Sequence, residues 1–397
     1  MPDNKKLKVL YLSRWYPNRF DPMPGLFIQR HAEAANLYCD VGVVYVHSLE
    51  FEKSILDYEV DYSLVNNVPT INVYYRNPKL NILVITSIIK AYRFYKANFL
   101  GIKEMNSKLG EFDILHIHIL TRLGVFGLYY KWLFGKKYFI SEHWSRYLEL
   151  TGNFKGFFRK FVTRIVVKNA AAVTTVTANL AKAMQSHSLK NSRYIVLPNV
   201  VSPDFLNVES VADNSKDRKS IVHVSCFEDK SKNISGILNV IDQLRKIRND
   251  FHFTMVGDGL DFEVLKSYSH KIGLTEKQVE FVGLMEGEQL VKKMQLADAL
   301  LIFSNYENFP VVINEAFSLG IPVIATRVGG IPENVSPLNG IIVEPGDEKG
   351  LLKAINNFFD GKYSFDRTKI KQKAVNDFCM QTVGKQLFDI YSEKENL

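Results

Sequence analysis

Apolar residues follow two periodicities that alternate along the whole chain. Short runs rich in β-branched residues are typical of buried strands, and longer stretches with apolar positions every three or four residues are typical of amphipathic helices. The strands predicted in the first half are Lys8–Leu12, Val41–Val46, Ile71–Tyr75, Ile114–Ile117, Tyr138–Ile140, Ala172–Val176 and Tyr194–Leu197. Those predicted in the second half are Ser220–Ser225, His252–Val256, Val279–Val282, Ala299–Phe303, Pro322–Ala325 and Ile341–Val343. Two series of this kind predict an α/β protein with two doubly wound, Rossmann-like domains built on parallel sheets.

A turn framed by two prolines, from Pro198 to Pro203, is the predicted domain boundary, and the polar stretch Asn207–Lys219 follows it. We therefore expect residues 1–199 and 200–382 to form the two domains. The pattern from Val383 to Leu397 predicts a final helix.

Composition places the chain among globular proteins, because 46% of its 397 residues are apolar and can build sizeable cores. Cys39, Cys226 and Cys379 form no C-x-x-C pair, which suggests a reducing compartment and argues against a disulfide framework. The apolar run at the N-terminus is too short for a signal peptide, and no run reaches the roughly 18 residues of a membrane span. These features predict a cytoplasmic protein.

Charge is unevenly distributed along the chain. Residues 1–200 hold 27 basic and 14 acidic side chains, a net charge of +13, whereas the remainder holds 23 and 28, a net charge of −5. A basic half indicates an anionic partner: a membrane surface, a phosphorylated acceptor or a nucleic acid. Nucleic acid ranks last, because the chain carries no zinc-finger spacing or nucleic-acid-binding signature.

The stretch from Phe154 to Lys168 combines an apolar helical stripe with flanking basic residues. Such a helix can dock on an anionic bilayer. It can equally be an ordinary helix with its stripe in the core and its charges in water. A weaker version of the pattern lies between Ile85 and Lys96.

Two carboxylates eight positions apart, Glu307 and Glu315, mark the most informative part of the sequence. Glu307 is predicted on a loop, and Glu315 about two turns into a helix with Pro310 at its first position. Backbone N–H groups at such a helix start can hold a phosphate, and the carboxylates can accept hydrogen bonds from sugar hydroxyls. Two Gly-Pro-apolar loops follow, starting at Gly320 and Gly330, where backbone can approach a ligand closely.

This stretch resembles the E-x7-E region of the retaining glycosyltransferases of family 4. It includes the strand Pro322–Thr326 and the double glycine Gly329-Gly330. The resemblance spans nearly the full chain and is most specific from Val256 to Asp347. It implies the GT-B architecture: an acceptor-binding domain (1–199) and a domain that binds a nucleotide-sugar donor (200–382) face each other across a cleft. The last helix (383–397) then crosses back onto the first domain.

The resemblance also assigns roles to residues of the second domain. Glu315 is the candidate for the ribose hydroxyls of the donor and Glu307 for its sugar. The remaining positions implied to line the donor site are Gly257, Gly259, Val282, Phe309, Val311 and Val312. The family more often has glycine at the positions of Asn308 and Pro310, which leaves the identity of the sugar open.

Catalysis requires stabilisation of the departing nucleoside diphosphate. No D-x-D triplet occurs in the chain, so no metal or cofactor is expected and cationic side chains must supply this charge. Lys232 matches the lysine of the family, but Phe227 occupies the spacing of its arginine. Lys230 is the candidate substitute, although lysine offers a point charge where arginine offers a planar fork. Both lysines have the alternative of being solvated loop charges.

The first domain offers a glycine loop and two strand ends. Gly25, at the start of a helix predicted near Leu26, is implied to admit substrate. Strand alternation puts His116 and His118 on one face, with His118 nearer the carboxyl edge. The resemblance assigns His118 to the sugar, and a pKa near neutrality would also permit proton transfer. Two histidines at i, i+2 also suggest a metal, but no third ligand follows at a supporting spacing. Glu142 and His143 are further candidates for the acceptor side, Glu142 as a base. Arg14, Arg30 and His31 lie near the glycine loop, where an anionic acceptor or simple packing explains them.

The sequence thus predicts a retaining glycosyltransferase that moves a hexose or N-acetylhexosamine from a UDP- or GDP-sugar to a glycan or lipid-linked acceptor, as in cell-surface polysaccharide assembly. Two alternatives use the same fold. An epimerase would change the sugar with no acceptor present, and a non-catalytic binding protein would bind nucleotide without releasing a diphosphate. A phosphorylase would need a cofactor-lysine motif that the sequence lacks.

Overall fold

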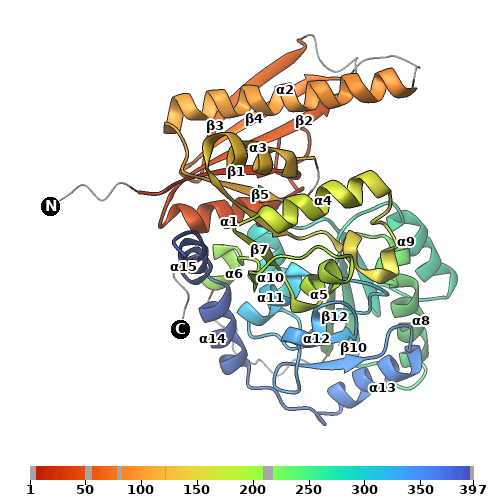
Figure 1. Ribbon diagram of the computed structural model, residues 1–397. Coiled ribbons are helices and arrows are strands. Elements are labelled where there is room, and N and C mark those ends of the chain that lie inside the picture. The colour runs from red at the N-terminus through yellow and green to blue at the C-terminus, as the bar shows by residue number, and fades with distance from the viewer. Residues whose placement is uncertain (1–5, 50–55, 78–82, 121, 209–217, 394–397) are drawn as a thin grey trace.

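The computed structural model describes residues 6–49, 56–77, 83–120, 122–208 and 218–393. The chain forms two α/β units, each built on a sheet with helices on both faces (Figure 1). Among these residues no helix is both long and apolar enough to span a bilayer.

The first unit contains an eight-stranded sheet in the order β3-β4-β2-β1-β5-β6-β7-β8. Its strands are β1 (Lys8–Ser13), β2 (Asp40–Leu49), β3 (Tyr58–Val65), β4 (Val68–Arg76), β5 (Ile114–His118), β6 (Lys137–Glu142), β7 (Ala172–Thr175) and β8 (Tyr194–Val196). Its helices are α1 (Leu26–Asn36), α2 (Leu83–Leu109), α3 (Gly124–Phe134), α4 (Phe157–Asn169) and α5 (Ala178–Ser186), with short 3-10 turns at Ser145–Tyr147 and Glu149–Thr151.

The second unit contains a six-stranded parallel sheet in the order β11-β10-β9-β12-β13-β14. Its strands are β9 (Lys219–Val224), β10 (Phe251–Val256), β11 (Val279–Gly283), β12 (Ala299–Ile302), β13 (Val323–Thr326) and β14 (Gly340–Val343). The helices from residue 203 onward are α6 (Pro203–Leu206), α7 (Asp229–Lys232), α8 (Ile234–Leu244), α9 (Phe262–Lys271), α10 (Gly287–Gln295), α11 (Val311–Ser318), α12 (Ile331–Asn334), α13 (Glu348–Phe359), α14 (Arg367–Phe378) and α15 (Met380–Tyr391).

Burial on both faces of each sheet explains why the central strands are continuously apolar. In β1, Leu10 packs into the core on one face and Tyr11 into the core on the other. In β12, Leu300 and Leu301 divide in the same way. Because both faces are covered, alternation disappears and the runs become uniformly hydrophobic, which is the signature of parallel sheets.

All thirteen predicted strands are present, with ends within three residues of those predicted. The structure also contains the strand β3, which was not predicted from the sequence. It pairs antiparallel with β4, so the first sheet is not wholly parallel. The two strands join through Asn66 and Asn67, whose φ angles of 46° and 66° are those of a hairpin turn. β3 lacks the buried apolar run of the other strands, because it lies at the edge of the sheet and its apolar side chains, such as Leu64 at 60% exposure, face outward.

The C-terminal helix α15 packs against α1 of the first unit, where Figure 1 shows the two side by side. A Cβ on Gly384 would lie 2.1 Å from the carbonyl oxygen of Ala34, so the helices approach closely. The hydroxyl groups of Tyr391 and Tyr11 are 2.8 Å apart. The chain end therefore returns to the first sheet. The division of domains at residue 199 stays a prediction, and residues 394–397 of the predicted final helix lie outside the described ranges.

Candidate active site

The loop after β12 and the start of α11 carry the two carboxylates. Glu307 lies in the loop and Glu315 in the helix, as the sequence predicted. The helix begins one residue later than expected, however: Pro310 is the residue before it, with ψ of 124°, and Val311 is the first helical position. Pro310 has no side chain to cap the helix, so the amides of Val311 and Val312 remain at a helix start with positive dipole. Phe309 beside them is buried.

Gly329 packs so closely against the backbone of Glu307 that no larger residue fits there. A Cβ on Gly329, whose φ is +54°, would lie 1.9 Å from the carbonyl oxygen of Glu307. The amide of Gly330 donates to the carbonyl oxygen of Asn308 at 2.7 Å. The double glycine thus holds the carboxylate loop in place through its backbone.

Lys232 forms an ion pair with Glu307. Its Nζ lies 2.5 Å from Oε1 of Glu307, and the two side chains are 16% and 11% exposed. Ser304 donates a second hydrogen bond to the same oxygen at 3.0 Å. Burial by itself would lower the pKa of Lys232, but the adjacent carboxylate outweighs burial and raises this pKa above its ordinary value. The lysine is therefore a fixed cation near neutral pH, positioned beside the proposed sugar contact.

Phe227 is buried in the core and Lys230 is exposed to solvent, although both lie in the segment that leads to Lys232. Phe227 is fully buried, with ring centroids 5.1 Å from Phe262 and 6.0 Å from Phe281. The position of the missing family arginine is thus a core position in this chain. Lys230 is exposed, and its carbonyl oxygen accepts a hydrogen bond from Asn305 at 3.1 Å.

The turn after β10 packs directly on the segment that leads to these lysines. A Cβ on Gly257, whose φ is +136°, would lie 1.8 Å from the carbonyl oxygen of Ser225. A Cβ on Gly259 would lie 2.7 Å from the backbone of Phe227. Contact between two loops therefore explains both glycines, apart from any ligand. Val282 lies nearby in the edge strand β11 and is partly exposed.

Glu315 meets a cation from the other unit. Arg30 of α1 places Nη1 3.2 Å from Oε1 of Glu315, and the side chains are 19% and 10% exposed. Burial raises the pKa of Glu315, and Arg30 opposes this rise. The sequence suggests packing or an acceptor contact for Arg30 and does not predict its pair with Glu315, since the two residues lie 285 positions apart.

Polar contacts from the second unit also fix the strand ends and α5 of the first. Asn308 accepts from Oγ1 of Thr177 at 3.2 Å and donates to the carbonyl oxygen of His143 at 3.0 Å. Both oxygens of Glu333 accept from the first amides of α5, those of Ala178 and Asn179, at 2.7 and 2.6 Å. Both hydrogen bonds of the Asn308 side chain are therefore made with the first unit. This is one of the positions at which the family more often has glycine.

His116 and His118 lie on one face of β5, with ring centroids 4.2 Å apart, as strand alternation predicted. His116 is a satisfied core residue: its ring nitrogens lie 2.6 Å from the hydroxyl of Tyr391 and 2.8 Å from that of Ser141. Neither ring nitrogen of His118 has a hydrogen-bond partner among the described residues. Burial and the neighbouring imidazoles lower the pKa of His118 well below its ordinary value. This overturns the expectation of a pKa near neutrality, and His118 is an uncharged group at pH 7.

The Glu142 carboxylate is a structural acceptor. It receives hydrogen bonds from the backbone amides of Leu120, His143 and Trp144 at 2.9, 3.0 and 2.9 Å. Burial raises the pKa of Glu142 to about 7, although these amides oppose the rise. Its oxygens hold the strand ends together, and the role of catalytic base stays a prediction.

Gly25 precedes α1, which begins at Leu26 as predicted, and has a φ of +76°. A Cβ there would lie 2.3 Å from the carbonyl oxygen of Trp15. The need for glycine therefore arises from the chain itself. Of the other residues near this loop, Arg14 donates its backbone amide to the carbonyl of His118 at 3.2 Å.

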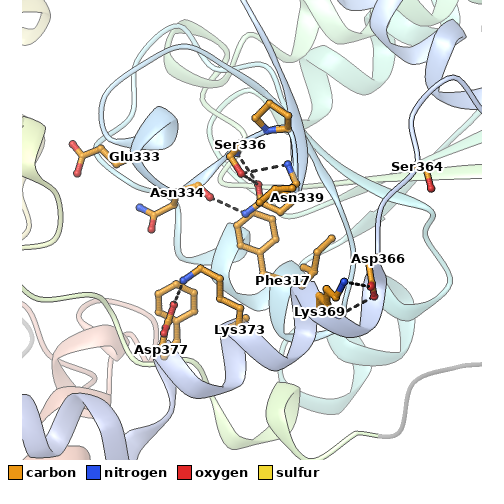
Figure 2. Close-up of a pocket in the computed structure, with 15 residues that line it drawn as sticks. Phe317, Glu333, Asn334, Ser336, Asn339, Ser364, Asp366, Lys369, Lys373 and Asp377 are labelled. Carbon is orange, nitrogen blue, oxygen red and sulfur yellow. Dashed lines mark hydrogen bonds and ion pairs between the residues drawn. The ribbon is translucent and has the colours of Figure 1, made fainter.

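A cavity of about 540 Å³ lies between α11, α12 and α14, away from the Lys232–Glu307 pair (Figure 2). Four of its charged side chains form pairs, Lys369 with Asp366 at 3.3 Å and Lys373 with Asp377 at 2.6 Å, and the fifth, Glu333, binds the amides at the start of α5. Because these charges are already compensated, the chemistry points to the Glu307 side of α11 and not to this cavity.

Two doubly wound units that meet beside the E-x7-E helix and the lysine–carboxylate pair give the chain the GT-B fold. The chain belongs to the group 1 glycosyltransferases of the family 4 type. Residues 208–376 match the family described as glycosyl transferases group 1, and residues 34–205 match the one described as glycosyltransferase family 4.

Similar proteins agree with this assignment. An uncharacterized glycosyltransferase of Methanocaldococcus jannaschii is 28% identical over 357 residues, which cover 88% of this chain and 89% of that relative. The lipopolysaccharide 1,6-galactosyltransferase of Escherichia coli is 29% identical over 137 residues, 34% of this chain and only 38% of that relative. The structure of the Anabaena protein HepE in complex with UDP and glucose aligns with a TM-score of 0.69 at 17% identity, over 98% of this chain and 100% of that one.

Proposed function

We propose that this protein is a retaining glycosyltransferase that moves a hexose or N-acetylhexosamine from a UDP- or GDP-sugar to a hydroxyl group of a glycan or lipid-linked acceptor. The observation that carries the proposal is the ion pair between Lys232 of α7 and Glu307 of the loop that leads into α11. It joins a cation suited to a diphosphate to a carboxylate suited to a sugar hydroxyl.

The transfer step has a simple balance. The bond between the anomeric carbon and the diphosphate breaks, and its electron pair leaves with the nucleoside diphosphate. A bond forms from the acceptor oxygen to the same carbon, and the acceptor proton passes to the departing phosphate. Lys232 and the amides of Val311 and Val312 stabilise the charge that develops on the diphosphate, so this part of the site needs no metal.

Sugar and ribose contacts divide between the two carboxylates. Glu307 accepts from hydroxyls of the donor sugar and Glu315 from those of the ribose, which can be received together by one carboxylate. Arg30, which pairs with Glu315, opposes the rise in the pKa of this carboxylate that burial causes. His118, uncharged at pH 7, positions the sugar by hydrogen bonding.

Donor binding is the first measurement. The purified chain is heated with UDP, GDP, ADP and their sugar conjugates, with chelator in place of added metal. We expect one nucleotide to raise the melting temperature, and UDP is favoured because HepE of similar fold was solved with UDP. A melting curve unchanged by every nucleotide would count against the nucleotide site itself.

Turnover distinguishes transfer from the alternatives. With the donor so identified, Lys232→Ala should lower kcat by about 10²- to 10³-fold, as loss of one charge-stabilising donor does. Lys230→Ala is the matched loop control and should have the smaller effect. Full turnover in both Lys232→Ala and Glu315→Ala contradicts the mechanism. A changed sugar without acceptor indicates an epimerase, and tight binding without diphosphate release indicates a non-catalytic protein.

The acceptor side fits an anionic membrane, which would place the enzyme on the cytoplasmic face of a bilayer. At the start of α4 the Phe157, Phe158 and Phe161 side chains are 88%, 77% and 52% exposed. The predicted stripe is therefore divided: Phe154 and Val166 pack in the core, and the aromatic residues between them face outward.

Basic residues surround these exposed rings. Lys155, Arg159 and Arg164 are exposed on the same segment, and the first half of the chain carries a net charge of +13. Apolar rings with a basic rim suit a bilayer of anionic lipids, since insertion and charge attraction add. A lipid-linked acceptor would then be presented beside the first unit, in keeping with the lipopolysaccharide enzyme among the relatives.

Vesicle sedimentation tests this contact. The chain should bind vesicles that contain anionic lipid and lose at least about tenfold in affinity on Phe157→Ser with Phe158→Ser, because each buried Phe contributes about 1.5–3 kcal/mol. Leu338→Ser, at a residue 82% exposed in the second unit, is the matched control. Equal binding by the double variant and the control would refute the role of α4.

A further inference from the structure

Three histidines from separate parts of the first unit converge on one point. His31 comes from α1, His118 ends β5 and His143 follows β6. Ring centroids are 6.2 Å apart for His31 and His118, 5.5 Å for His31 and His143, and 5.9 Å for His118 and His143. One nitrogen from each ring lies within 4.8 Å of the others.

The ring nitrogens of this triad are buried and unsatisfied. Nδ1 of His31 and both ring nitrogens of His118 have no hydrogen-bond partner among the described residues, and the ring of His143 has only the side chain of Asn199 nearby. Leaving a buried polar group unpaired costs about 1–3 kcal/mol each. Because one nitrogen from each of the three rings lies near the same point, these groups indicate a site for a ligand that accepts nitrogen lone pairs or hydrogen-bonds with them.

His31 is already oriented as a metal ligand would be. Its Nε2 lies 3.0 Å from the carbonyl oxygen of Pro198, which can only accept, so Nε2 carries the proton. Nδ1 is therefore the unprotonated nitrogen, and its lone pair is available to a ligand. A histidine that ligates a metal typically donates its other N–H to a backbone carbonyl in this way.

We propose that His31, His118 and His143 form a binding site for a divalent transition metal, with Zn²⁺ as its best fit. The described ligand set contains imidazoles and no carboxylate, which favours Zn²⁺ over Mg²⁺ or Ca²⁺. Three histidines with an open fourth position are a known arrangement for zinc.

Small movements complete the geometry. Tetrahedral zinc with bonds of about 2.1 Å sets its nitrogen ligands about 3.4 Å apart. Starting from a spread of at most 4.8 Å, each nitrogen moves inward by at most about 0.8 Å. Phe27 and Tyr11 wall the site, with ring centroids 4.6 Å from His143 and 4.4 Å from His118.

The fold supplies the ligand that sequence spacing did not show. The pair His116 and His118 gave no third ligand along the chain, so no metal was expected. In the structure His116 is excluded, because Tyr391 and Ser141 occupy its nitrogens, and the partners of His118 come from α1 and from the segment after β6.

A bound metal would occupy His118, which the proposed function assigns to the donor sugar. Metal and donor then compete, and Zn²⁺ inhibits transfer. This consequence rests on the proposed function, whereas metal binding does not.

Metal content is measured on untagged chain, loaded with Zn²⁺ or Co²⁺ and desalted at pH 7.5. We expect one ion per chain, and for Co²⁺ the intense visible absorption of a four-coordinate site. His31→Ala and His118→Ala should each lose the band and at least about tenfold in affinity. His252→Ala, a partly exposed histidine of the second unit, is the matched control.

Each outcome is decisive for the site. Absence of a stoichiometric ion and of the band in the wild-type chain overturns the proposal, and so does a band that survives in His31→Ala. Circular dichroism establishes that the variants are folded. If the band is present but Zn²⁺ leaves turnover unchanged, the metal site stands and the proposed contact of His118 with the donor sugar is refuted.

Discussion

Replacing Lys232 by alanine leaves the Glu307 carboxylate buried without its cation. The two side chains are 16% and 11% exposed and meet at 2.5 Å. Breaking a buried ion pair on one side costs about 3–5 kcal/mol. Ser304 keeps one hydrogen bond to the carboxylate, so we expect the lower end, about 3 kcal/mol. In a unit of this size the melting temperature falls by about 2–4 °C for each kcal/mol of stability lost, so we expect a fall of roughly 6–12 °C.

Thermal unfolding without nucleotide measures this loss, and a double-mutant cycle assigns it. Lys232→Ala with Glu307→Gln removes the unpaired charge and should recover most of the stability, while turnover stays lost because the cation is still missing. The control is Lys246→Ala, which breaks an exposed pair with Asp242 and should change stability by less than about 1 kcal/mol. The reasoning is wrong if Lys232→Ala melts like the wild-type chain, or if the double variant is no more stable than the single one.

The raised pKa of Lys232 fixes the direction of a pH effect. A base whose pKa is higher in the folded state stabilises the fold fully below its unfolded pKa, near 10.5, and this stability is lost as the pH rises through the folded value. Alkaline unfolding followed by circular dichroism should therefore show a stability loss above pH 10 that Lys232→Ala lacks. Identical alkaline profiles for the two proteins would contradict the coupling.

Three further variants probe the site and its support. Phe227→Arg, which restores the family residue, should destabilise the chain by several kcal/mol in urea unfolding and leave kcat no higher, because position 227 is fully buried; a stable variant with raised kcat would contradict this. Gly329→Ala should raise KM for the donor at least about tenfold, because its Cβ would lie 1.9 Å from the carbonyl oxygen of Glu307; unchanged donor titration would show that the loop adapts. Burial lowers the pKa of His31 to about 4, so folding stability present above pH 6.5 is lost as the pH falls towards 4. In unfolding titrations, His31→Gln should lose less folding stability than the wild-type chain between pH 6.5 and 4. An equal loss in both proteins would mean that other groups cause it.

Local patterns along the chain predicted most of the architecture. The buried strands were found because both faces of each sheet are covered, which makes their runs uniformly apolar. The edge strand β3 was missed for the opposite reason, since its outward-facing residues are mixed in character. The carboxylates at 307 and 315 were found because they lie eight positions apart, on a loop and the helix that follows it, and Lys232 was found because it matches the lysine of the family.

Residues that act through long-range contacts were beyond sequence reasoning. Arg30 and Glu315 are 285 positions apart, and only the packing of the two units brings their charges together. The hydrogen bonds that Glu142 accepts from three backbone amides were not predicted either, because these amides lie at the ends of β5 and β6 and one of them is 22 positions away.

The sequence by itself determined the alternation of strands and helices, the family and the loop that carries Glu307, because each is encoded in periodicity or in a short motif. Tertiary structure decided which groups are buried together, and burial sets charge and pairing. It made His118 an uncharged member of a triad with His31 and His143, and it locked Lys232 onto Glu307. Desolvation and contacts between distant segments are properties of the packed chain, so no local pattern carries them.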